Sequence, residues 1–202
     1  MKKLLVILAL AVAAVAPSAV ANTVTLANGP FHLKPGGIFT ATSTGVINQT
    51  YNTFCVESAV GFHLGVTYTY NLSQVDHAGN PLTLGTAWLY RQYVDGAFSI
   101  TSNALAGELQ AAIWHFQSQT LDIPASFPSG DPGNPFTDLA DAALGANAWK
   151  ASNGVYGVDI VELWTVAGAP AQSMLHVPDG GATMALLGMG LIALAAIRRR
   201  IF

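Results

Sequence analysis

The chain has 202 residues, of which 51% are hydrophobic and 9% are charged. This length allows one domain or two small ones. Between residues 22 and 176, three basic residues stand against ten acidic ones, which gives a net charge of −7. Such a surface repels the phosphates of nucleic acids and weakly favours basic or amine-bearing partners, so the charge argues against a nucleic-acid partner.

The first 21 residues have the pattern of a secretory signal peptide. Lys2 and Lys3 precede an apolar run, and Ala19-Val20-Ala21 forms a small-residue cleavage site. An N-terminal membrane anchor is the alternative, but the apolar run is short and the cleavage site is well placed. The pattern therefore predicts an exported protein whose mature chain begins near Asn22.

The segment after the signal peptide is rich in residues that form strands and turns. Residues 22–50 predict short strands interrupted by proline and glycine, and residues 51–56 predict a strand with Cys55 near its end. The clearest strand covers residues 62–72, where large apolar side chains alternate with smaller or polar ones. Residues 76–81 predict a turn.

Two helices are predicted next, a short one over residues 86–94 and a longer one over residues 103–117. The second begins at Asn103, a good N-cap residue. Its apolar residues recur at helical spacing: Leu105, Leu109, Ala112, Ile113 and Phe116. At about 100° per residue, Gln110 and Trp114 lie beside this stripe, so we expect Gln110 at the margin of the buried face.

The remaining part of the mature chain predicts a proline-rich loop over residues 121–135 and another helix over residues 137–148. A closing strand over residues 155–166 and a small-residue linker over residues 167–177 follow. Together these elements predict a single α+β domain at residues 22–170, with a β-rich layer and a small helical part.

The C-terminal end has three consecutive features. Val177-Pro178-Asp179-Gly180-Gly181 precede an apolar run over residues 182–197, and Arg198-Arg199-Arg200 follow it. Sixteen helical residues reach roughly 24 Å, slightly less than a hydrocarbon core of about 30 Å. We expect a linker and sorting motif at residues 171–181 and a transmembrane segment with a basic cytoplasmic tail at residues 182–202.

This order resembles the sorting signals called PEP-CTERM, in the variant that carries Val-Pro-Asp. The resemblance implies recognition by a membrane transpeptidase of the exosortase type and cleavage near Pro178-Asp179. It further implies transfer of a transiently membrane-anchored protein to the cell envelope or an extracellular matrix. A plain single-pass anchor is the alternative.

Cys55 is the only cysteine. An exported protein meets an oxidising compartment, and a single cysteine has no partner for an internal disulfide. Three explanations remain open: a buried inert cysteine, an intermolecular disulfide, or a thiol consumed by other chemistry.

Two motifs bear on this choice. Thr53-Phe54-Cys55-Val56-Glu57 and Leu109-Gln110-Ala111-Ala112-Ile113-Trp114, with Ala87-Trp88-Leu89-Tyr90 upstream of the second, resemble the thioester domains of bacterial surface adhesins. The resemblance implies that Cys55 and Gln110 condense into an internal thioester, which an amine of a partner then attacks. Domains of this type on adhesins are often longer, so we expect this chain to have fewer peripheral elements.

Several neighbouring side chains are candidates for a supporting role. Phe54, Trp88 and Trp114 are candidate walls of a dry site. His115 is a candidate for proton transfer or an exposed side chain, and Glu57, on the same strand face as Cys55, either orients a donor or is solvated. The other histidines show no metal-ligand spacing, so we expect no metal and no cofactor.

The sequence thus predicts an exported surface protein that couples once to an amine and is not an enzyme. One alternative is a non-reactive structural matrix protein in which Cys55 is inert. Another is a cysteine hydrolase that uses Cys55 and His115, although no nucleophile turn or third orienting residue is recognisable. Reaction with amines separates the three, because a hydrolase turns over, a thioester reacts once and a matrix protein does neither.

Overall fold

The structure is a computed structural model that describes residues 20–119, 125–131 and 133–178. The predicted transmembrane segment, nearly all of the signal peptide and Asp179-Gly180-Gly181 lie outside the described residues. Within the described ranges, no helix is both long enough and apolar enough to cross a membrane.

Six antiparallel strands form one sheet in the order β3-β2-β1-β4-β5-β6. Their bounds are β1 Thr23–Leu33, β2 Gly36–Thr44, β3 Thr50–Thr53, β4 Thr67–Ser73, β5 Asp159–Trp164 and β6 Pro170–His176. Alternation decides which side chains face inward: Val24 and Leu26 of β1 are buried, whereas the intervening Thr25 is partly exposed. Threonine suits these outward positions because its branched side chain fits a pleated, half-exposed surface.

The two edges of the sheet come together just after β3. The Val56 amide donates to the Ser173 carbonyl at 2.9 Å, and the Leu175 amide donates to the Phe54 carbonyl at 3.2 Å. Between them, Cys55 forms an isolated bridge with Met174. Because β3 and β6 are the edge strands, these bonds close the sheet on itself.

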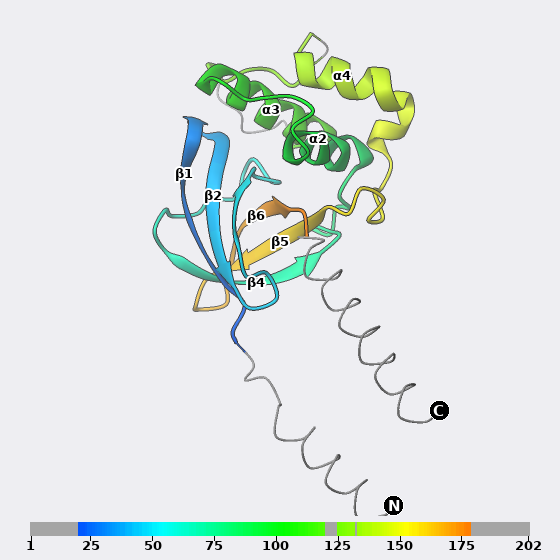
Figure 1. Ribbon diagram of the computed structural model, residues 1–202. Helices are drawn as coiled ribbons and strands as arrows, with labels where there is room; N and C mark the ends of the chain where they lie inside the picture. The colour runs from blue at the N-terminus through cyan, green and yellow to red at the C-terminus, as the bar shows by residue number, and fades with distance from the viewer. Residues whose placement is uncertain (1–19, 120–124, 132, 179–202) are drawn as a thin grey trace, which may run out of the picture.

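The described residues also form three α-helices, α2 (Leu84–Val94), α3 (Asn103–Phe116) and α4 (Pro135–Leu144), and a 3-10 helix, η1 (Gly145–Trp149). Each α-helix begins after a residue whose side chain accepts a backbone hydrogen bond, namely Thr83, Ser102 and Asn134. The helices gather at one end of the sheet (Figure 1).

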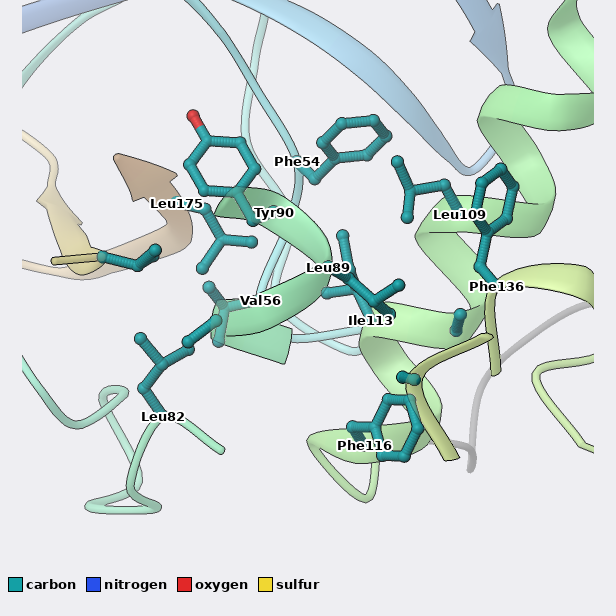
Figure 2. Close-up of a cluster of buried hydrophobic side chains, with 14 of the residues drawn as sticks. Phe54, Val56, Leu82, Leu89, Tyr90, Leu109, Ile113, Phe116, Phe136 and Leu175 are labelled. Atoms are coloured by element: carbon teal, nitrogen blue, oxygen red, sulfur yellow. The ribbon is translucent and has the colours of Figure 1, made fainter. Parts of the chain in front are cut away.

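The fold has two adjoining cores. One lies between the walls of the closed sheet and includes Leu26, Cys55 and Trp114. The other lies between the sheet and the helices and includes Phe54, Ile113 and Leu175 (Figure 2). Neighbouring residues of one strand thus enter different cores, because successive side chains point to opposite faces.

The predicted α+β class, with a β-rich layer and a small helical part in one domain, is confirmed. The boundaries differ in places. The strand expected at residues 62–72 begins only at Thr67, and Leu64 and Val66 are exposed. The helix expected to reach residue 148 ends at Leu144 and continues as η1.

The prediction of a linker at residues 167–177, and of a domain that ends at residue 170, is wrong. Strand β6 occupies Pro170–His176, and every residue of it after Pro170 is buried. A strand that is covered on both faces does not alternate between apolar and polar residues. The sequence of β6 therefore lacks the usual strand pattern and resembles a linker in composition. The folded domain therefore extends to His176 and leads directly into Val177.

Candidate functional site

Cys55 lies where the closing segment crosses from β3 to β6. Its residue is 2% exposed, and the hydrogen bonds of Phe54 and Val56 to β6 fix its backbone on both sides. Thr53 strengthens this contact, because its hydroxyl donates to the Leu175 carbonyl at 2.6 Å. The position of the thiol is thus set by strand pairing between residues more than one hundred positions apart in the sequence.

Gln110 lies directly against Cys55. Its Oε1 accepts a hydrogen bond from the Cys55 amide at 3.0 Å, and its Nε2 donates to the Cys55 carbonyl at 2.8 Å. Gln110 is fully buried, whereas the sequence predicted a position at the margin of the buried helix face. It is buried because α3 packs against β1 and β2 of the closed sheet. The structure therefore brings together the two residues that the sequence motifs single out.

Gly36 encloses the pair from the start of β2. A Cβ atom at this position would lie 2.5 Å from Cγ of Gln110 and 3.0 Å from Cη2 of Trp114. Only glycine permits this close approach of a backbone to a side chain. Sequence reasoning missed the role of Gly36, because Gly36-Gly37 after Pro35 is also a common turn signal.

The candidate walls divide between the two cores. Trp114 is 2% exposed, shares a core with Cys55 and packs against Phe127 with ring centroids 5.5 Å apart. Phe54 faces the other core, and Trp88 is half-buried at the border of that core. Of the three predicted walls, only Trp114 lies in the same core as the thiol.

Glu57 is a buried anchor, and the interpretation of a solvated carboxylate is wrong. Its two oxygens accept hydrogen bonds from the backbone amide and the hydroxyl of Ser173, each at 2.8 Å. Burial raises the pKa of this carboxyl group, against the lowering effect of the Ser173 bonds. Glu57 thus joins the Cys55 segment to β6, two residues beyond the thiol.

His115 is directed toward other partners. Its ring lies 4.8 Å from that of Trp149, and its Nδ1 is 3.7 Å from a carboxylate oxygen of Asp131. These contacts occupy the outer side of α3, away from the side that carries Gln110. Among the described residues, no group of three metal-ligating side chains is close enough to hold an ion.

The environment of the Cys55 thiol disfavours its ionised form, the thiolate. Burial, and secondly the nearby carboxylate of Glu57, raise the pKa of Cys55. The thiolate is the nucleophilic form, and the residue is 2% exposed, so the Cys55 thiol is a poor nucleophile toward reagents from solution. Attack by this thiol therefore favours a neighbouring group that is already in contact with it.

The comparisons with known proteins identify the end of the chain. The family model of the VPDSG-CTERM motif matches residues 176–201. The chain carries a C-terminal sorting motif. This motif supports export and association with the envelope, and it implies processing by a sorting enzyme of the exosortase type. It starts at His176, the last residue of β6, so the VPDSG-CTERM motif follows the folded domain without a spacer.

No curated protein and no solved structure matches the chain.

Proposed function

We propose that this exported, envelope-sorted protein forms an internal thioester between Cys55 and Gln110, and that the bond couples once to an amine of a surface or matrix partner. The observation that carries the proposal is the pair of hydrogen bonds between the Gln110 carboxamide and the Cys55 backbone. Both hydrogen-bonded atoms, Oε1 and Nε2, are attached to the carboxamide carbon of Gln110. The two hydrogen bonds therefore hold this carbon next to Cys55.

The bond would form by attack of the Cys55 sulfur on the Gln110 carboxamide carbon. The carbon–nitrogen bond breaks, and the thiol proton leaves with the nitrogen as ammonia, so the reaction needs no oxidant or cofactor. Groups held in well-oriented contact gain roughly 7–11 kcal/mol relative to a bimolecular encounter. Such a gain offsets the low reactivity of a protonated thiol.

The surroundings suit both formation and protection of such a bond. The Cys55 amide already donates to Oε1 of Gln110, the atom that becomes negative during attack, so it acts as an oxyanion donor. Gly36 and Trp114 close the site, and neither Cys55 nor Gln110 is more than 2% exposed. Exclusion of water slows hydrolysis of the product.

In the second step, an amine nitrogen attacks the Gln110 carbonyl carbon. The carbon–sulfur bond breaks, an amide remains on Gln110, and the amine proton returns to the sulfur of Cys55. Because the product is stable, the protein reacts once and is not an enzyme. The net charge of −7 on residues 22–176 weakly favours amine-bearing partners.

A non-reactive structural protein is the second candidate, and one observation favours it. The Gln110 carboxamide satisfies both backbone groups of Cys55, which is a sufficient structural reason for a buried glutamine. In that case Cys55 is an inert core residue. A cysteine hydrolase has less support, because His115 contacts Trp149, Phe116 and Asp131.

Intact-mass measurement of the mature domain separates these candidates. The thioester requires a mass below that of the sequence by one ammonia and a thiol that resists alkylation under denaturing conditions. Methylamine should then add once and release one alkylatable thiol. A full sequence mass, with a thiol that alkylates on unfolding and no methylamine adduct, would establish the structural alternative.

A further inference from the structure

A second site lies on the same domain and is unrelated to the thiol. A cleft of about 790 Å³ opens between β3, the C-terminal end of α2 and the loop that joins α2 to α3. Val177 and Pro178, which follow β6, form another part of its wall. Neither Cys55 nor Gln110 lines it. Its size is within the range of binding sites for small molecules and short chain segments.

Aromatic rings form much of the cleft: Tyr51, Tyr90, Tyr93 and Phe98. Tyr90 and Tyr93 have centroids 6.3 Å apart with planes inclined by 31°, and Tyr93 and Phe98 have centroids 6.5 Å apart at 35°. In both of these pairs the ring planes are tilted and not perpendicular. Tyr93 and Phe98 are only partly buried, so they offer ring surface to a ligand.

The polar groups between the rings are mostly uncharged. Asn52, Gln49 and Ser99 line the cleft, and the Tyr51 hydroxyl is buried with no hydrogen-bond partner among the described residues. Among the described residues of the lining, Arg91 is the one that carries a charge, and its Nε donates to the carboxylate of Asp95 at 2.8 Å. This part of the cleft is thus close to neutral on a domain with a net charge of −7.

We propose that this cleft binds a neutral saccharide chain. A sugar ring has apolar C–H faces that pack on aromatic rings and a rim of hydroxyl groups, each of which donates and accepts. Asn52 and Gln49 carry amide groups that match that rim, because an amide both donates and accepts, here in addition to the bonds that Asn52 Oδ1 accepts from Thr40 and Gln49 Nε2 makes with His176. The paired Arg91 leaves no free charge to hold a charged ligand, and an acidic ligand would also be repelled by the negative field of the domain.

The position of the cleft is consistent with this ligand. Its wall includes Val177 and Pro178, which belong to the sorting motif, so the site lies where the domain continues toward its envelope attachment. An exported, envelope-sorted protein meets envelope polysaccharides at that position. The proposal does not depend on the thioester, since it involves reversible binding alone.

Isothermal titration calorimetry of the mature protein with four neutral hexasaccharides tests the proposal. The probes are β-1,4-glucan, β-1,3-glucan, α-1,4-glucan and β-1,4-mannan hexamers, with chitosan and oligogalacturonate hexamers as the cationic and acidic comparisons. We expect at least one neutral hexamer to bind more tightly than either charged one. Absence of binding by all four neutral hexamers, or a preference for a charged hexamer, would overturn it.

Two variants assign the binding to the cleft. Tyr93→Ala and Phe98→Ala should each weaken binding by roughly tenfold, as expected for loss of an aromatic contact. Tyr156→Ala removes a partly buried tyrosine outside the cleft and should leave binding unchanged. Amide NMR shifts in the unmodified protein give a second readout, which should centre on residues 96–100; shifts confined to other surfaces would contradict the assignment.

Discussion

The side chain of Gln110 pairs with the backbone of Cys55 as a neighbouring strand would. Its carboxamide accepts from the Cys55 amide and donates to the Cys55 carbonyl, at 3.0 Å and 2.8 Å. Both groups come from buried positions in different layers of the fold, one on α3 and one on the segment that closes the sheet.

Substitution at either end of the pair should abolish the bond. Cys55→Ser and Gln110→Glu each remove one reacting group with little change in volume. Both variants should show the full sequence mass and no methylamine adduct, and the Cys55 thiol of Gln110→Glu should alkylate after unfolding. If only one of the two variants lost the mass difference and the methylamine adduct, the modification would not be a bond between Cys55 and Gln110.

Gln110 should also stabilise the fold independently of any reaction. In the Cys55→Ser background no thioester forms, and Gln110→Ala then leaves the backbone amide and carbonyl of residue 55 without partners. Each buried group that loses its partner costs about 1–3 kcal/mol. Urea unfolding should show this loss, whereas Gln92→Ala on the half-buried face of α2 serves as the control and should change stability little.

The close approach at Gly36 gives a steric test. Gly36→Ala places a methyl group 2.5 Å from Cγ of Gln110, so α3 or β2 must shift. Overpacking of this kind costs about 1–3 kcal/mol, and we expect a smaller fraction of protein with the thioester. Gly61→Ala is the matched control, because a Cβ there has nothing within 4 Å. Equal effects of the two substitutions in thermal unfolding and intact mass would contradict the packing argument.

His176 should make stability depend on pH. Burial lowers its pKa from 6.5 to about 4, and its Nε2 lies 2.6 Å from Nε2 of Gln49, which suits an unprotonated ring that accepts. The pKa of His176 is lower in the folded protein than in the unfolded chain. The unprotonated ring therefore contributes its full stabilisation of the fold above pH 6.5, and this contribution is lost as the pH falls toward 4. The loss should be on the order of 2 kcal/mol, after allowance for solvent screening.

The measurement is the difference in unfolding free energy between the unmodified protein and His176→Phe across that pH range. This difference should fall as the pH falls. The exposed His63→Gln variant should follow the unmodified protein throughout. A constant difference for His176→Phe would show that the ring titrates alike in the folded and unfolded states.

Processing should leave a mature chain that begins near Asn22 and ends near Pro178. Because the folded domain reaches His176, we expect the sorting enzyme to act within a few residues of β6. Terminal mass mapping of protein recovered from the cell surface tests this expectation. Mature material that retains Arg198-Arg199-Arg200 would indicate a plain membrane anchor.

The sequence by itself determined the features that depend on local order. The sorting motif is read as a contiguous string, and α3 follows from apolar residues at helical spacing, although its N-cap is Ser102 and not the predicted Asn103. The alternation of Tyr68 and Tyr70 with exposed threonines likewise marks β4. The motifs around Cys55 and Gln110 were also visible in the sequence, although their contact was not.

Only the tertiary structure decided how these parts meet. Strand β6 has no local signature, because it is buried on both faces and gains its partners from β5 and from residues 54–56. The burial of Gln110 and Glu57 depends on this closure, since local periodicity gives the face of a residue but not what covers it. Gly36 shows the same limit: its contact with Gln110 joins residues 74 positions apart, which no local pattern of glycines specifies.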